Sequence, residues 1–115
     1  GHQAGDEVLR VVSRVLAKHV RKVDETFRFG GEEFVIILPD ADAEISASIA
    51  GRVRAAIETT DVKMDETKVG NVTISLGFAV LSGETDTPET LLKRADAALY
   101  EAKETGRNRV IFGKV

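Results

Sequence analysis

The residues best suited to chemistry lie in the stretch 28–34, where two glycines are followed at once by two acids. Gly30 and Gly31 allow a backbone to approach a ligand closely at a turn. Glu32 and Glu33 are poor strand formers at a place where an apolar strand should begin, and such local conflicts concentrate at functional sites. If both acids were in strand conformation, their side chains would point to opposite faces. A tight hairpin with two solvated acids explains the pattern equally well.

Two further sets of charged residues have spacings that could serve binding. Lys103 and Arg107 lie four residues apart at the end of an expected helix, which would bring two positive groups to one side, although the spacing alone favours a solvated last turn. Arg21 and Asp24 form an Arg-x-x-Asp pattern, which is common at helix ends. Arg52, on the second expected helix, could contribute to a binding site, but an exposed position on the helix explains it equally well. Taken alone, these residues are not diagnostic.

The composition limits the chemistry that the chain can perform. It has 115 residues, with 16 basic and 19 acidic side chains, a formal net charge of -3 and no cysteine. Disulfide frameworks, thiolate zinc sites and cysteine nucleophiles are therefore excluded. A slightly acidic protein has no overall field that collects nucleic acid, so an anionic ligand must be held locally by Arg, Lys, backbone N–H groups or metal ions. No apolar run approaches a bilayer span, and the lack of cysteine is compatible with a reducing cytoplasm. We therefore expect a cytoplasmic domain without nucleic-acid or membrane contacts.

Apolar residues at spacings of three and four predict the helices that would position these side chains. The first helix is expected over 6–21. The second is capped by Asp40 or Asp42, and its apolar stripe should pack on a sheet. A Thr-Pro-Glu sequence at 87–89 opens the third helix, and Gly106 closes it in a left-handed conformation.

Alternating or continuous apolar residues predict the strands. Segments 26–29 and 34–38 form a β-hairpin that turns at the two glycines, and the second strand should be covered on both faces. A strand within 72–80 should pair with 61–64, and 108–112 returns as the last strand. The order of elements predicts an α/β sandwich of the α+β type, in which one mixed, largely antiparallel sheet is covered by helices.

Ordered motifs along the whole chain carry a more specific signal. They are Gly1-His2 with Gly5-Asp6-Glu7-Val8-Leu9, Gly30-Gly31-Glu32-Glu33-Phe34, Thr73-Ile74-Ser75-Leu76-Gly77, Ala95-Asp96-Ala97-Ala98-Leu99-Tyr100-Glu101-Ala102-Lys103 and Gly106-Arg107-Asn108. Together they resemble the GGDEF family of diguanylate cyclases, with Glu in place of the Asp in the family's signature. The resemblance implies a single domain over residues 1–115, similar to the ferredoxin-like palm of nucleotidyl cyclases and polymerases.

The resemblance also implies a reaction. A diguanylate cyclase condenses two GTP molecules into cyclic di-GMP with loss of two pyrophosphates, and each domain of a homodimer holds one GTP. Attack of a ribose 3′-hydroxyl on an α-phosphorus needs charge neutralisation and alignment, which Mg²⁺ or Mn²⁺ would supply. In the parent protein, a sensory or receiver domain would precede this domain.

The family's catalytic roles are carried over to the hairpin by resemblance. Glu32 would be a metal ligand next to the reacting phosphate, since hard Mg²⁺ prefers carboxylate oxygen. Glu33 would assist deprotonation of the attacking hydroxyl. Gly30 and Gly31 would allow the hairpin to lie against the nucleotide.

Three residues outside the hairpin match the family's substrate contacts. Asp6 would read guanine, because a carboxylate can accept from both N1–H and the exocyclic amine. A helix cap is the structural alternative for Asp6. Lys103 and Arg107 would hold the terminal phosphates of GTP.

The distance in sequence between the Arg-x-x-Asp pattern and the hairpin indicates a candidate binding role for the pattern. At this offset, Arg21 and Asp24 resemble the family's inhibitory product site, where Arg binds a guanine edge bidentately and Asp accepts from its other edge. Arg52 matches a secondary arginine of that site.

The resemblance covers this chain but not the whole family domain. The family begins with a helix and a central strand that carry a DxDxFKxxND segment just before the Gly-His pair, and this sequence starts at Gly1. We therefore expect an N-terminally incomplete domain whose 115 residues alone turn over GTP poorly or not at all. The alternative function is a catalytically inactive module that binds cyclic di-GMP or dimerises. A third possibility, another protein of the palm architecture, conflicts with the hairpin and Arg-x-x-Asp motifs.

Overall fold

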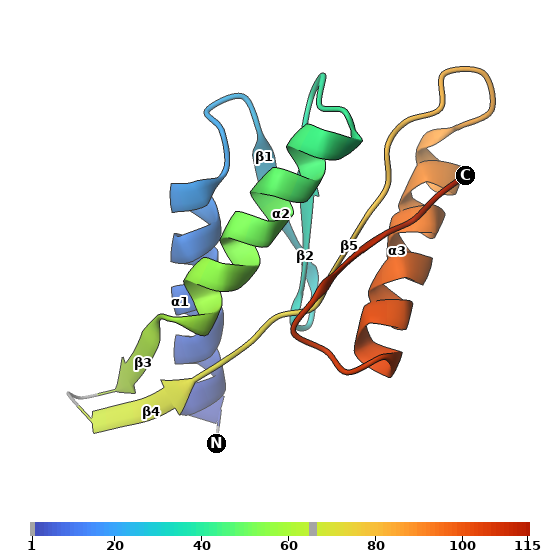
Figure 1. Cartoon of the computed structure of the whole chain (residues 1–115). Coiled ribbons are helices and arrows are strands. Elements are labelled where there is room, and N and C mark those ends of the chain that lie inside the picture. The colour runs from blue at the N-terminus through green and yellow to red at the C-terminus, as the bar shows by residue number, and fades with distance from the viewer. Residues whose placement is uncertain (1, 65–66) are drawn as a thin grey trace.

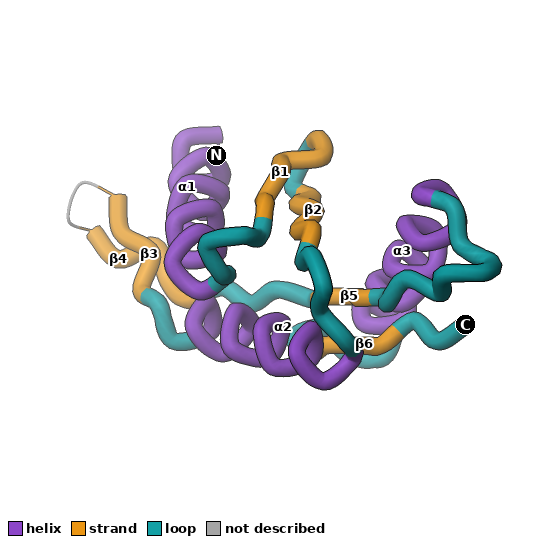
Figure 2. Tube along the Cα trace, turned by 90° about the horizontal axis from the view of Figure 1, so that it is seen from above, coloured by secondary structure: helices purple, strands orange, loops and turns teal. Residues whose placement is uncertain are grey.

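Three helices and six short strands alternate along the part of the chain that the computed structural model describes, residues 2–64 and 67–115. The β-hairpin stands between α1 and α3, and α2 crosses one side of it (Figure 1). Seen from above, α2 lies in the same layer as β5 and β6 (Figure 2). The α+β class expected from the sequence is confirmed. None of the helices in the described ranges is long and apolar enough to cross a membrane.

The core lies between α1 (His2–His19) and α2 (Ala43–Glu58). Both helices bury most of the apolar stripe that their sequence spacing predicts, although Ile45 near the start of α2 is 39% exposed. The buried cluster consists of Val12, Leu16, Ile49, Val53 and Ile57. Because α1 begins at His2, Asp6 lies inside the helix, and the alternative that it caps the helix is wrong.

Of the two candidate caps of α2, the structure selects Asp42. Its carboxylate accepts a hydrogen bond of 2.8 Å from the backbone N–H of Ile45. Such a bond satisfies one of the free N–H groups of the first helical turn. Asp40 lies in the preceding turn with a φ of 55° and is not the cap.

The hairpin consists of β1 (Glu25–Gly30) and β2 (Glu33–Ile37), which pair antiparallel. Its turn falls at Gly31 and Glu32, one residue later than predicted, because Gly30 still pairs with Glu33 across a bulge. The two glycines have φ values of 113° and 53°, a region that favours glycine. The expectation that the second strand is covered on both faces is wrong. Ile37 is 51% exposed, since only the face with Phe34 and Ile36 packs on the core.

The remaining strands pair differently from the prediction. The partner of β3 (Asp61–Met64) is β4 (Thr67–Asn71), and not the strand expected within 72–80. The nearer segment forms this pair because closing a short loop costs less entropy than closing a long one. Of residues 72–80, only β5 (Leu76–Phe78) is a strand, and it pairs parallel with β6 (Val110–Phe112). The described strands thus form three separate pairs, where the sequence predicted one sheet. An open groove, described below, lies between β2 and the segment that contains β5.

Both predicted ends of α3 (Pro88–Glu104) are confirmed. Thr87 and Thr90 bind each other's backbone N–H groups in a capping box. Gly106 has a φ of 128°, and the N–H of Arg107 donates to the carbonyl of Ala102 at 2.8 Å, so the chain leaves the helix by a left-handed turn. The helix lies directly on β5: a Cβ at Gly77 would meet the α3 backbone, including the carbonyl carbon of Ala98 at 2.7 Å.

Candidate functional site

A groove of about 370 Å³ brings together four of the residues singled out in the sequence. Glu32 and Glu33 line it from the hairpin, and Lys103 and Arg107 line it from the end of α3. The remainder of the lining is mainly apolar and comes from α1, α2, residues 34–38 and 72–78, and Leu99 of α3. Two carboxylates and two cations that are distant in sequence therefore border one cavity, as a site for a metal-bound anion requires.

The hairpin turn places both acids at this groove. Glu32 lies in the turn and Glu33 is the first residue of β2. They are not both in strand conformation, so the expected alternation to opposite faces does not apply. Both side chains are exposed to solvent, and the groove is open.

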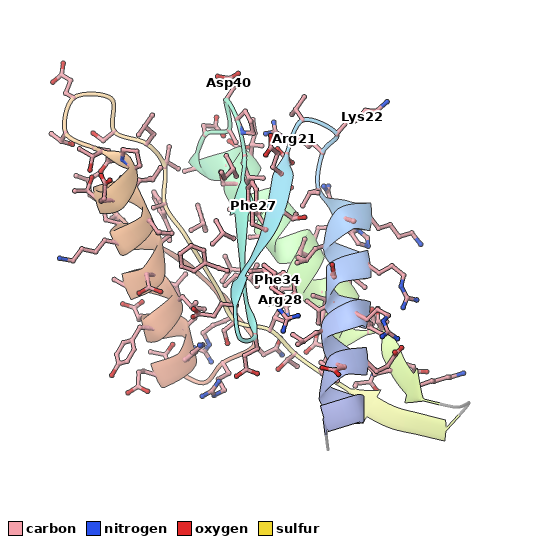
Figure 3. The ribbon with its side chains drawn as sticks, turned by 180° about the vertical axis from the view of Figure 1, so that it is seen from behind. Arg21, Lys22, Phe27, Arg28, Phe34 and Asp40 are labelled. Atoms are coloured by element: carbon pink, nitrogen blue, oxygen red, sulfur yellow. The ribbon has the colours of Figure 1, made fainter. Side chains whose placement is uncertain are left out.

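Arg28 fixes the turn, a role that sequence reasoning missed. Its Nε and Nη2 donate to the carbonyl oxygen of Gly31 at 3.0 and 2.7 Å. The guanidinium thereby holds the residue directly before Glu32, and Figure 3 shows Arg28 beside Phe34 near the end of the hairpin. The only signal in the sequence is an arginine three residues before a glycine, which is too common to be diagnostic.

The two cations reach the groove by a different geometry from the one expected. Arg107 lies beyond the last residue of α3, so the four-residue helical spacing to Lys103 does not describe the pair. The left-handed turn at the helix end, and not the helix face, brings Arg107 to the groove.

Asp6 lies apart from these four residues. It lines a second cavity of about 630 Å³ between α1 and β1, together with Arg10 and Arg14 of the same helix and Arg28 of the hairpin. Leu9 and Phe34 line both cavities. Gly30 and Gly31 line neither, and a Cβ on either glycine would meet nothing within 4 Å. The glycines are therefore required by the backbone conformation and not by lack of space.

The donor set at the groove suits Mg²⁺ or Mn²⁺ held jointly with a phosphate ligand. In the described ranges, no group of three or more His, Cys, Asp or Glu side chains could hold a metal ion. Mg²⁺ in nucleotide sites is commonly bound through one or two carboxylates, with substrate phosphates and water as the other ligands. Glu32 and Glu33 supply two carboxylates at the groove, so the residues fit such a shared site.

The Arg-x-x-Asp motif forms a closed ion pair. Arg21 Nη2 lies 2.8 Å from Asp24 Oδ1, and the Arg21 backbone N–H donates to Oδ2 at 2.6 Å. The hydrogen bond from the Arg21 side chain holds the pKa of Asp24, whose side chain is 0% exposed, below its ordinary value. Arg21 also donates to the carbonyl of Pro39 at 2.7 Å. In Figure 3, Arg21 lies against the strands while Lys22 extends away from the molecule.

Arg52 reaches the same end of α1 from α2. Its Nη2 donates to the carbonyl oxygen of His19, the last residue of α1, at 2.6 Å. His19 precedes Arg21 by two residues, so the structure brings all three predicted product-site residues to one corner of the molecule. Arg52 is exposed and Arg21 is half-buried.

Comparison with protein-family models identifies the domain. Residues 1–109 match the model described as "Diguanylate cyclase, GGDEF domain". The chain belongs to the GGDEF family. Synthesis of cyclic di-GMP is the general reaction of these diguanylate cyclase domains.

Curated proteins related to this GGDEF domain are longer than the chain. It is 46% identical over 112 residues to the response regulator PleD of Caulobacter vibrioides, covering 96% of this chain and 25% of PleD. It is 39% identical over 114 residues to diguanylate cyclase A of Treponema denticola, covering 99% of this chain and 30% of that protein. The chain therefore spans a quarter to a third of these relatives.

Solved GGDEF domains share the fold. The GGDEF domain of DgcB from Caulobacter crescentus, solved in complex with c-di-GMP, superposes with a TM-score of 0.91 at 35% identity, covering 98% of this chain and 67% of that one. The active GGEEF domain of a diguanylate cyclase from Vibrio cholerae gives a TM-score of 0.86 at 27% identity, covering 100% of this chain and 72% of that one. Its GGEEF signature has Glu as the first acid, as does this chain at Glu32.

Proposed function

We propose that this GGDEF domain condenses two molecules of GTP into cyclic di-GMP, within a homodimer in which each domain holds one GTP. The observation that carries the proposal is the single groove lined by Glu32, Glu33, Lys103 and Arg107. In each half-reaction, a ribose 3′-oxygen bonds to the α-phosphorus of the other GTP, and the bond from that phosphorus to pyrophosphate breaks. Two such steps give the cyclic product and two pyrophosphates.

The basic and acidic residues of the groove have different roles. Lys103 and Arg107 bind the terminal phosphates, with the guanidinium able to bind phosphate oxygens bidentately. Glu33 accepts the proton of the attacking 3′-hydroxyl. Mg²⁺ or Mn²⁺ shared by Glu32 and the phosphates would neutralise the charge that develops on the α-phosphate.

The guanine base would be read from the second cavity. Asp6 lines that cavity on α1, and its carboxylate can accept from guanine N1–H and the exocyclic amine. Leu9 and Phe34 separate the two cavities, so one nucleotide would extend across them.

The reaction is tested on the full-length protein with GTP and Mg²⁺. Chromatography should show GTP converted into cyclic di-GMP with one pyrophosphate released per GTP, and ATP should not be consumed. Formation of a product other than cyclic di-GMP, or no consumption of GTP, would contradict the proposed function.

We also propose that Arg21, Asp24 and Arg52 bind the product and inhibit the enzyme. Their common corner supports this role, as do the Nη1 groups of Arg21 and Arg52, which make no hydrogen bond within the residues that the structure describes. Cyclic di-GMP carries two guanines and two phosphodiesters, which match arginine side chains and a carboxylate. The complex of the DgcB GGDEF domain with c-di-GMP shows that a similar domain binds this nucleotide.

Arg21→Ala should weaken the binding of cyclic di-GMP by roughly tenfold to a hundredfold, the loss expected for one bidentate contact to guanine. Isothermal titration calorimetry measures this affinity. Lys22→Ala is the matched control, because Lys22 is the next residue, is exposed and points away from the corner. If Arg21→Ala leaves the affinity for cyclic di-GMP unchanged, the assignment of Arg21 to the product site is wrong.

We infer further that the domain acts in the cytoplasm under the control of a sensory or receiver domain of the same protein. The related PleD is named a response regulator, and this chain covers only 25% of it. Diguanylate cyclase SiaD of Pseudomonas aeruginosa, whose GGDEF region is similar to this chain, was solved in complex with its activator SiaC.

A further inference from the structure

The loop that follows α3 holds two consecutive non-glycine residues in a left-handed backbone conformation. Arg107 has a φ of 62° and Asn108 has a φ of 47°. L-residues rarely adopt this conformation, and it persists only where surrounding contacts hold it. Contacts outside the loop must therefore stabilise it.

Two residues of α2 fix the Asn108 side chain. Its Oδ1 accepts from Arg54 Nη1 at 2.9 Å, and its Nδ2 donates to Glu58 Oε2 at 2.6 Å. Arg54 and Glu58, one helical turn apart, also form an ion pair of 3.3 Å. The hydrogen bond from Asn108 is the main cause that holds the pKa of Glu58 below its ordinary value. The three side chains form a closed network that ties the loop to α2.

In contrast to its backbone, the guanidinium of Arg107 has no partner among the residues that the structure describes. The backbone N–H of Arg107 donates to the carbonyl of Ala102 at 2.8 Å, and the backbone carbonyl of Arg107 accepts from Arg109 Nε at 3.0 Å. Within residues 2–64 and 67–115, no hydrogen bond or ion pair engages the Arg107 guanidinium. Arg107 lines the groove that Glu32 also lines. The loop thus presents an unengaged cation from a fixed backbone.

We propose that Asn108 is a positioning residue for the triphosphate site, held by Arg54 and Glu58 so that Arg107 points into the groove. The inference rests on the proposed function, in which Arg107 binds the terminal phosphates. Asparagine suits the position because it tolerates the left-handed conformation, and its amide can accept from an arginine while it donates to a carboxylate. Neither alanine nor aspartate combines these properties.

The experiment measures the affinity of the full-length protein for 3′-deoxy-GTP with Mg²⁺ by calorimetry. This nucleotide lacks the attacking hydroxyl and therefore binds without reacting. The variants are Arg107→Ala, Asn108→Gly and the double variant. Glycine adopts the left-handed conformation without strain, so Asn108→Gly should retain a Tm close to that of the unmodified protein. Glu101→Gln, exposed near the end of α3, is the control.

We expect Asn108→Gly to weaken binding about tenfold, because a misplaced charged group loses much of its interaction. Arg107→Ala should weaken it by roughly tenfold to a hundredfold. The double variant should match Arg107→Ala within a factor of about two, since Asn108 acts through Arg107.

The outcomes distinguish the positioning role of Asn108 from the assignment of Arg107 to the substrate. If Arg107→Ala weakens binding but Asn108→Gly does not, the positioning role is overturned while the proposed function stands. If the two losses multiply in the double variant, Asn108 acts independently of Arg107, and the inference is also overturned. If Arg107→Ala leaves the affinity unchanged, the assignment of Arg107 to the substrate is wrong, and the inference fails with it.

Discussion

Replacing Glu32 by alanine should lower the rate of cyclic di-GMP formation by roughly a thousandfold in the full-length protein. Charge stabilisation by a bound divalent ion contributes several kcal/mol to a transition state, and each 1.36 kcal/mol is about a factor of ten in rate. Without the Glu32 carboxylate, the groove keeps only Glu33 as an acid from the hairpin. The measurement is the initial rate at saturating Mg²⁺, followed by chromatography of the nucleotides.

The same variant distinguishes the enzyme from its alternative, a module that only binds cyclic di-GMP or dimerises. Glu32 lies in the hairpin turn, and the residues of the proposed product site gather at the end of α1, so Glu32→Ala should leave the affinity for cyclic di-GMP unchanged. Glu25→Ala is the control, since Glu25 is an exposed acid of the same hairpin that does not line the groove. A variant that retains full synthetic activity would exclude Glu32 from catalysis.

Replacing Arg94 by alanine should lower the free energy of unfolding by about 1–3 kcal/mol, the usual loss when the hydrogen-bonding partner of a desolvated polar group is removed. Arg94 is 18% exposed and pairs with the Asp86 carboxylate, which is 5% exposed. It also donates to the carbonyl oxygens of Val80 and Gly113, at 2.9 Å each. One side chain therefore ties α3 to the segment after β5 and to the segment after β6. Urea unfolding measures the loss, and Lys93→Ala, an exposed neighbour, should change little.

The Asp86 carboxylate also makes the free energy of unfolding depend on pH. The backbone N–H of Ser82, with further hydrogen bonds from Arg94 and Thr90, holds the pKa of Asp86 below its ordinary value. A carboxyl with a lowered folded-state pKa contributes stability that is present above its unfolded pKa of about 3.9 and is lost as the pH falls through the folded value. The unmodified protein should therefore lose stability below about pH 4, and Arg94→Ala should lose less over that range. An equally steep decline in both proteins would contradict the role of Arg94.

Local signals in the sequence predicted the parts of the fold that local physics determines. The caps at Asp42 and Thr87, the left-handed Gly106 and the apolar stripe of α2 were predictable because each depends on residues within one or two helical turns. Strand pairing was not, because the apolar alternation of residues 72–80 favoured them as the partner of β3, whereas the actual partner, β4, is mostly polar. The choice depends on loop length and packing that no short window contains.

The candidate site divides in the same way. Glu32 and Glu33 could be identified from the local sequence, because acids are unusual at the start of an apolar strand. The roles of Arg107 and Arg21 were ambiguous until the motifs were taken together. Asn108 belonged to one of these motifs, but its partners on α2 could not be found from sequence. Arg54 lies 54 residues away and forms its hydrogen bond only through the tertiary fold.

The pairing of consecutive strands has a consequence for the order of folding. In the described chain, β1 pairs with β2, β3 with β4, and β5 with β6, so no pair skips a strand. The antiparallel pairs β1–β2 and β3–β4 close short loops and should form quickly, whereas the parallel pair β5–β6 must close across α3 and the contact of α1 with α2 must close across the hairpin. We therefore expect the two antiparallel pairs to form as separate early units. The slower step would be their assembly around the two helices, where the stability of the core is gained.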